Sequence, residues 1–112
     1  MTELREPTFL VLAALADGRK HGYAIIAEAE AISKGRVSLK AGTLYTALER
    51  LEADGLIAKA GDEVVDGRLR RYYDLTDKGA SKLADEATRQ QQNAAAATQR
   101  LRARSIRVAV AQ

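Results

Sequence analysis

Hydrophobic positions recur with helical spacing in four stretches of the chain. The first stretch runs from Pro7 to about Ala16, carries a broad apolar stripe and is stopped by Asp17-Gly18. The second begins near His21-Gly22 and ends at about Ser33. Its predicted buried side consists of Tyr23, Ile25, Ile26 and Ala29. These two stretches predict a pair of short amphipathic helices joined by a tight turn.

The third stretch predicts a helix with one apolar face and one polar face. Ser38 is the expected N-cap residue, and Asp54-Gly55 ends the helix. Inward-facing leucines follow helical spacing at Leu44, Leu48 and Leu51. The outward positions are then Gly42, Thr46, Glu49 and Ala53, with Thr43, Tyr45 and Arg50 on the flanks.

Two strands and a long helix follow. Residues 56–58 and 69–75 read as strands, and Asp66-Gly67 between them is a strong tight-turn pair. Thr76 is a good N-cap for a last helix that could run to about Arg107. Residues 106–110 alternate like a strand, so the end of this helix stays open. The element order predicts an α+β, mainly α, winged helix-turn-helix with a long C-terminal helix.

Length and composition limit the chain to one small domain with an appended element. Its 112 residues are divided here into a winged-helix domain over 1–75 and a C-terminal dimerisation helix over 76–112. Apolar residues make up 46% of the chain, but many are alanine and only five residues are aromatic. A monomer would be marginally stable, and pairing with a second copy would help.

The same composition narrows the location and the chemistry. There is no cysteine, no signal-peptide pattern at the N-terminus and no apolar run of membrane-spanning length, so a cytoplasmic location is expected. His21 is the single histidine, and we interpret it as a helix-start residue that hydrogen-bonds locally. We predict no metal site, no cofactor and no catalytic residue.

The net charge of +3 permits nucleic-acid binding without requiring it, and the distribution of charge is more informative. The third helix has the form that enters a major groove. Gly42 lets the backbone approach a phosphate, Thr43 and Tyr45 can donate hydrogen bonds to phosphates, and Thr46 can meet a base edge. The alternative interpretation is an ordinary amphipathic helix with a polar outside.

The predicted hairpin favours the DNA-binding interpretation. Alternation places Arg68 and Arg70 on one face and Leu69 and Arg71 on the other, next to the turn. An arginine-tipped ribbon can enter a minor groove or clamp phosphates, although a charged edge strand that guards against aggregation is also common. The predicted DNA-binding residues are Ser38, Lys40, Gly42, Thr43, Tyr45, Thr46, Arg50, Arg68, Arg70 and Arg71.

Several motifs together resemble the PadR family of bacterial transcriptional regulators. They are Leu15-Ala16-Asp17-Gly18 with His21-Gly22-Tyr23, then Gly42-Thr43-Leu44-Tyr45 with Arg50-Leu51-Glu52 and Gly55-Leu56-Ile57, and finally Gly67-Arg68 with Arg70-Arg71. The single C-terminal helix is similar to the short subgroup of that family. Thr46 and Ala24 stand where the family often has proline and glutamate.

The resemblance implies a homodimeric repressor of transcription whose C-terminal helix packs against the partner subunit. In some members a small aromatic or drug-like effector releases the DNA, so a small hydrophobic or aromatic effector is a candidate partner. A weak heptad seam supplies the predicted dimer interface at Leu83, Ala87, Ala94, Ala97, Leu101 and Val108. The expected main partner is double-stranded DNA with a near-palindromic operator.

Two other function classes compete with DNA binding. Winged helices also mediate protein contacts, and Glu49 on the presumed DNA face is unusual for a phosphate-facing surface, so an adaptor without DNA binding is the alternative. An enzyme is disfavoured because the sequence shows no convergent polar cluster.

Overall fold

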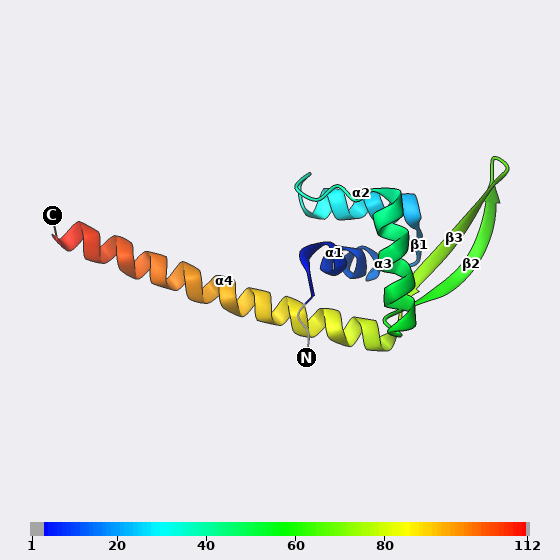
Figure 1. Ribbon diagram of the computed structural model, residues 1–112. Helices are drawn as coiled ribbons and strands as arrows, with labels where there is room; N and C mark the ends of the chain where they lie inside the picture. The colour runs from blue at the N-terminus through cyan, green and yellow to red at the C-terminus, as the bar shows by residue number, and fades with distance from the viewer. Residues whose placement is uncertain (1–3, 112) are drawn as a thin grey trace.

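The computed structural model describes residues 4–111; the outermost ends of the two predicted domains, residues 1–3 and 112, lie outside the described residues. The elements are α1 (Glu6–Leu15), β1 (Lys20–His21), α2 (Gly22–Ile32), α3 (Ala41–Ala53), β2 (Ile57–Val65), β3 (Arg68–Leu75) and α4 (Asp77–Ala111). Figure 1 shows α1, α2 and α3 packed together, with the β2–β3 hairpin on one side and α4 projecting far beyond the body on the other. The mainly helical α+β class is confirmed, and so is the predicted order of the four helices and two long strands.

The core is formed where the apolar faces of α1, α2 and α3 meet the base of the hairpin. It includes fully buried leucines from α1 and α3, together with Ile25 of α2, Ile57 of β2 and Tyr73 of β3. The inward positions predicted for α3 are confirmed, because Leu44, Leu48 and Leu51 are all at most 4% exposed. This packing fixes which face of α3 is left for solvent.

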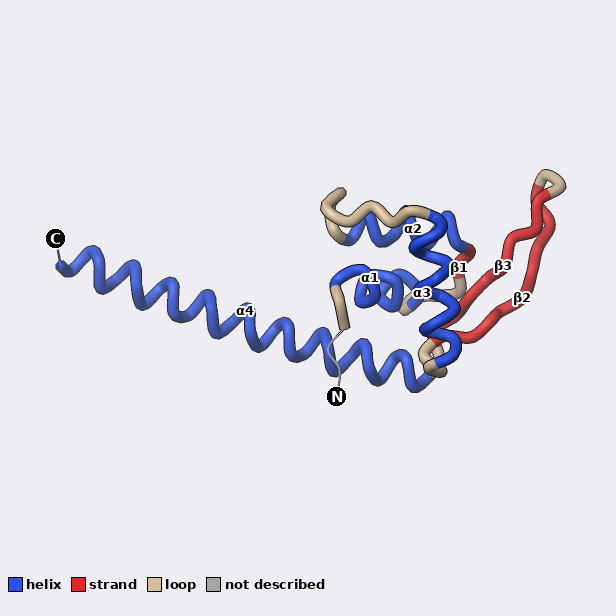
Figure 2. Tube along the Cα trace, viewed as in Figure 1, coloured by secondary structure: helices blue, strands red, loops and turns tan. Residues whose placement is uncertain are grey.

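The three strands form an antiparallel sheet in the order β1-β3-β2, coloured red in Figure 2. Val65 pairs with Arg68, so Asp66 and Gly67 form a two-residue turn, both with positive φ, as a type I′ hairpin requires. The predicted turn is therefore confirmed. The register shifts between Lys59 and Asp62, which places a bulge in the middle of β2.

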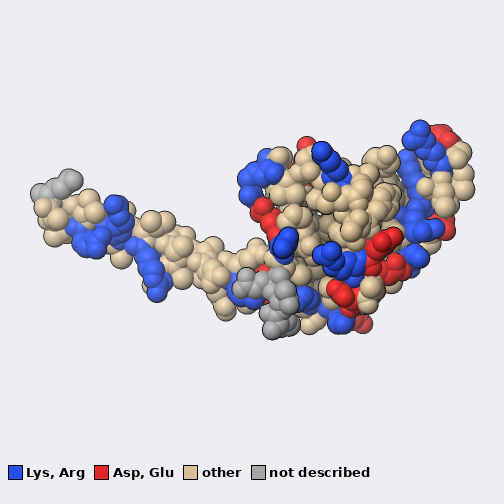
Figure 3. Space-filling model, in the orientation of Figure 1, with Lys and Arg blue, Asp and Glu red and all other residues tan. Residues whose placement is uncertain are grey.

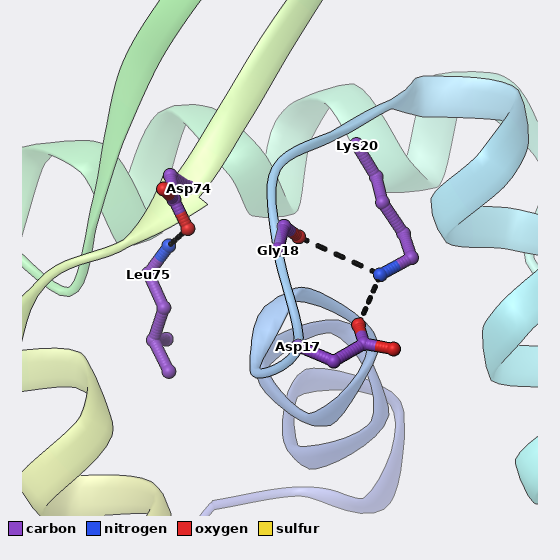
Figure 4. Close-up of polar contacts among 5 residues, drawn as sticks. All are labelled: Asp17, Gly18, Lys20, Asp74 and Leu75. Atoms are coloured by element: carbon purple, nitrogen blue, oxygen red, sulfur yellow. Dashed lines mark hydrogen bonds and ion pairs between the residues drawn. The ribbon is translucent and has the colours of Figure 1, made fainter.

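Strand β1 was not predicted. It has two residues, Lys20 and His21, which pair with Tyr73 and Tyr72 of β3. The turn before it is held by the Lys20 ammonium, which donates to the Asp17 carboxylate and, at 3.5 Å, to the Gly18 carbonyl (Figure 4). The hydrogen bond and positive charge of Lys20 hold the pKa of Asp17 below its usual value.

Two predictions about local structure are wrong. Tyr23 is 68% exposed, because the buried side of α2 follows Gly22, Ile25 and Ala29 and Tyr23 lies off that stripe. Ser38 does not cap α3, which begins at Ala41 after Lys40 with no side-chain cap. The segment before α3 stays non-helical and packs Leu39 against the core, so the helix starts later than predicted.

Helix α4 begins as predicted and ends later. Thr76 caps its first turn, since its hydroxyl oxygen accepts from Gly79 N at 3.0 Å while donating to the Gly55 carbonyl at 2.6 Å. Gly79 is buried, and a Cβ there would lie 2.0 Å from the Leu56 carbonyl oxygen, so the helix crosses directly over that backbone. The helix continues through residues 106–110 because no Pro or Gly interrupts it after Gly79.

Candidate nucleic-acid interface

The outer face of α3 is open to solvent along its whole length. Gly42, Thr46, Glu49 and Ala53 are all exposed. Thr46 already donates its hydroxyl hydrogen to the Gly42 carbonyl at 3.0 Å, so within the protein its oxygen keeps only acceptor capacity. This face is a small-residue surface that a neighbouring backbone or base edge could approach closely.

We call residues 57–75, the β2–β3 hairpin, the wing. Its cross-strand pairs put Arg68 and Arg70 on one face and Leu69 and Arg71 on the other, as predicted. Arg71 Nε lies 3.5 Å from Asp62 Oδ1 across the strands, and both side chains are about half exposed. Such an exposed pair contributes little to stability, so Arg71 can exchange its partner for another anion at small cost.

The base of the wing is anchored to the body by aromatic and polar contacts. The Arg19 guanidinium lies 4.4 Å from the centre of the Tyr72 ring, and its Nη1 donates to the Ala60 carbonyl at 2.7 Å in the bulge. The His21 ring meets Tyr72 edge to face at 5.5 Å. His21 also caps α2, because its Nδ1 accepts a hydrogen bond from Ala24 N at 3.4 Å. This contact confirms the local role predicted for the histidine.

A cavity of about 420 Å³ lies between the wing, the start of α2 and one flank of α3. We call it the wing cleft. Its body side is lined by His21, Gly22, Tyr23 and Tyr45, and its wing side by residues including Arg68, Arg70 and Arg71. Tyr45 is 47% exposed there. The structure thus brings Tyr45 together with all three predicted wing arginines.

The other flank of α3 faces α1. Gly42, Thr43, Thr46 and Arg50 line a second cavity of about 450 Å³, whose far wall comes from Arg5, Pro7, Thr8 and Val11. We call it the α1 cleft. Ser38 and Lys40 are exposed in the segment that leads into α3. The predicted DNA-binding residues therefore fall into two groups, on either side of the outer face of α3.

Sequence reasoning missed several residues that border these clefts, among them Tyr23 in the wing cleft, and Arg5 and Thr8 in the α1 cleft. Tyr23 was assigned to the core because its neighbours are apolar. Arg5 and Thr8 lie more than thirty positions from α3 along the chain. The spacing of hydrophobic residues within one helix does not show which distant segment that helix will contact.

Charged side chains gather away from the core. Figure 3 shows Lys and Arg along the wing and along the far half of α4.

Within residues 4–111 there is no group of three or more side chains of the metal-binding types, and no helix is both long and apolar enough to cross a bilayer.

A three-helix body in which α3 presents a polar outer face beside a two-stranded wing defines the winged helix-turn-helix class. The model of the transcriptional regulator PadR-like family matches residues 11–85, more than half of the chain. The chain belongs to this family of transcriptional regulators.

Individual relatives and structures agree. Transcriptional regulator Rv3488 of Mycobacterium tuberculosis is 41% identical over 71 residues, 63% of this chain and 63% of that protein. A PadR family regulator from Clostridium difficile R20291 superposes with a TM-score of 0.71 at 28% identity, over 87% of this chain and 99% of that one. Bacillus subtilis PadR, solved in complex with operator DNA, superposes with a TM-score of 0.63 at 26% identity, over 72% of this chain and 46% of that chain.

The matched lengths differ among the curated relatives. The chain spans just under two thirds of the Mycobacterium tuberculosis regulator and 21% of an uncharacterised 37.1 kDa protein of a Streptomyces fradiae transposon, to which it is 47% identical over 78 residues. The family model itself matches the winged-helix body and the start of α4.

Proposed function

We propose that this chain is a dimeric, sequence-specific DNA-binding protein that represses transcription. One observation carries the proposal: Tyr45, on a flank of α3 next to its exposed outer face, lines the wing cleft together with the three wing arginines. A helix and a basic ribbon side by side match the two grooves of a duplex. The family membership and the operator complex of the Bacillus subtilis neighbour support the same assignment.

In this proposal the contacts divide between phosphates and bases. Tyr45, Thr43 and the wing arginines would meet phosphates, which position the protein without reading sequence. Gly42 and Thr46, which are exposed on the outer face of α3, would meet base edges. Ser38 and Lys40, just ahead of α3, would reach the flanking backbone, and Arg50 would do so from the α1 side.

The dimer in this proposal is held by α4, over the C-terminal domain 76–112. Almost every side chain from Gln90 to Ala111 is exposed, including Leu101 at 62% and Val108 at 37%. The apolar seam of this exposed stretch is the surface that a second copy would bury. Leu83, also assigned to the seam, is half-buried against the chain's own core, so its contribution to a partner is smaller.

Charge along α4 favours an antiparallel pair. The last third of the helix carries Arg100, Arg102, Arg104 and Arg107 and no acid, whereas the first third mixes Asp77, Asp85 and Glu86 with Lys78 and Lys82. Among residues 4–111, no carboxylate is within ion-pair distance of Arg102, Arg104 or Arg107. Parallel helices would align these arginines with those of the partner, and antiparallel helices would keep the two basic ends apart.

A small hydrophobic or aromatic effector would complete the regulatory cycle. The α1 cleft offers about 450 Å³ with apolar walls from Val11, Leu39 and Leu44 directly beside Gly42 and Thr46. An effector bound in this cleft would contact α3, the helix that would read DNA. A compound that binds this cleft should raise the melting temperature and weaken DNA binding together.

A salt titration on a mixed-sequence duplex tests the proposal. A DNA binder loses affinity linearly in the logarithm of salt concentration, and replacing one phosphate-contacting arginine among Arg68, Arg70 and Arg71 with Ala should reduce that slope by about one. The absence of binding at any salt concentration would favour a protein-interaction adaptor, the function that the exposed Glu49 on α3 would suit.

A further inference from the structure

The first residue of α2 lies against the tip of Tyr45. Gly22 is buried, and a Cβ built on it would lie 2.8 Å from Tyr45 Oη and 3.2 Å from Tyr45 Cζ. The next atom in range is Leu44 Cδ2, at an ordinary contact distance of 3.6 Å. No backbone atom outside the helix is among the three nearest, so the only severe conflict is with the hydroxyl end of one side chain.

Tyr45 belongs to α3, and its phenol reaches back toward the start of α2 while remaining 47% exposed in the wing cleft. Its hydroxyl therefore occupies the space that any side chain at position 22 would take. Leu44 beside it is fully buried and holds the backbone of α3 in place. An added methyl group would move the phenol rather than the helix, because the far end of a side chain shifts more cheaply than packed backbone.

We propose that Gly22 is a positioning residue for DNA binding: its missing side chain sets where the Tyr45 hydroxyl lies in the wing cleft. This inference rests on the proposed function, in which Tyr45 donates to a phosphate. The hydroxyl then faces the same space as Arg68, Arg70 and Arg71 of the wing. A methyl group at position 22 has to push the hydroxyl away from its 2.8 Å contact toward an ordinary contact distance. A shift of that kind weakens a hydrogen bond, because hydrogen bonds depend steeply on distance and angle.

The test compares Gly22→Ala, Tyr45→Phe and the double variant on a fluorescently labelled mixed-sequence duplex at low salt. Phosphate contacts are independent of sequence, so no operator is needed. Tyr45→Phe should weaken binding about tenfold, as expected for a lost hydrogen bond to a charged group. Gly22→Ala should cause a similar loss, and the double variant should be no weaker than the weaker single variant. Ala27→Ser, one added heavy atom at an exposed position of α2, is the matched control and should bind like wild type.

Thermal unfolding separates positioning from folding. Gly22→Ala should keep the wild-type melting temperature to within a few degrees, since the new methyl group displaces only the end of Tyr45. If Gly22→Ala does not fold, Gly22→Ala combined with Tyr45→Ala must restore folding, because the second change empties the contested space. If Gly22→Ala combined with Tyr45→Ala still fails to fold, the inference is overturned and Gly22 is assigned to backbone packing.

Other outcomes separate this inference from the proposed function. Wild type that binds no DNA would refute the proposed function itself. Wild type that binds, with Tyr45→Phe weakened and Gly22→Ala unchanged, would refute only the role of Gly22. Losses that simply multiply in the double variant would also refute it, because two independent residues behave in that way.

Discussion

Replacing Leu48 with Ala should destabilise the fold while leaving the DNA-facing surface intact. Leu48 is 1% exposed and lies on the inward face of α3, where the helix packs against α2 and β2. A Leu→Ala change at such a site costs about 2–5 kcal/mol, since burial is lost and a cavity remains. The higher helix propensity of Ala returns only a few tenths of a kcal/mol. A net loss of about 3 kcal/mol is expected.

That loss converts into a large shift in melting temperature. The unfolding entropy is about 2.1 cal/mol/K per residue, so a chain of 112 residues has about 0.24 kcal/mol/K. A loss of about 3 kcal/mol should therefore lower the melting temperature by roughly 12 °C. Circular dichroism at one protein concentration measures it, because a dimer's melting temperature depends on concentration.

The control lies on the opposite face of the same helix. Glu49 is exposed, and Glu49→Ala should change stability by no more than about 0.5 kcal/mol. If Leu48→Ala melted within about 3 °C of wild type, the inward face of α3 would be wrongly assigned. The same conclusion would follow if Glu49→Ala were the more damaging change.

Three further changes test other parts of the structure. Gly79→Ala should prevent α4 from docking, because its Cβ would meet the Leu56 carbonyl oxygen at 2.0 Å. The fold should lose more than about 2 kcal/mol, despite the higher helix propensity of Ala. A stability at or above wild type in urea unfolding would contradict this crossing. Leu101→Asp should convert the dimer to monomer in sedimentation, since it would place an unpaired charge in the seam, and an unchanged dimer would exclude that placement. The pKa of Asp17 is lowered by Lys20, so its stabilising contribution should be full above the usual carboxyl value of about 3.9 and lost as pH falls through the lower folded value. Asp17→Asn should remove that part of the acid dependence, which lies below about pH 5, in urea unfolding, and an identical pH profile would contradict the Lys20 contact.

Local patterns predicted much of this fold. The three-to-four spacing of Leu44, Leu48 and Leu51 identified the inward face of α3, and Asp66-Gly67 identified the turn of the wing. Thr76 identified the start of α4. Each of these signals acts within a few residues of its own position, which is why sequence alone was sufficient.

The errors arose where distant segments decide the outcome. Tyr23 looks like a core residue within α2, but the buried stripe is set by packing against α1 and α3. Strand β1 has no period of its own and exists because β3 offers it a partner. Ser38 is a reasonable cap by type, yet the burial of Leu39 keeps that segment non-helical.

The interface shows the same limit. Sequence reasoning selected Tyr45 and the wing arginines, and the structure places them around one cleft. It could not relate Gly22 to Tyr45, because 23 positions separate them and the contact depends on an absent side chain. Only the three-dimensional structure shows that the missing side chain of Gly22 leaves room for the Tyr45 hydroxyl.

The most direct test of the central claim is to select bound fragments from genomic DNA and to measure protomers per site on the best fragment. A dimeric DNA reader should enrich a near-palindromic site that binds two protomers, with half-site centres separated by about 34–36 Å or a multiple of it. An enriched site without two-fold symmetry that binds one protomer, or no enrichment over input DNA, would contradict a dimeric DNA reader.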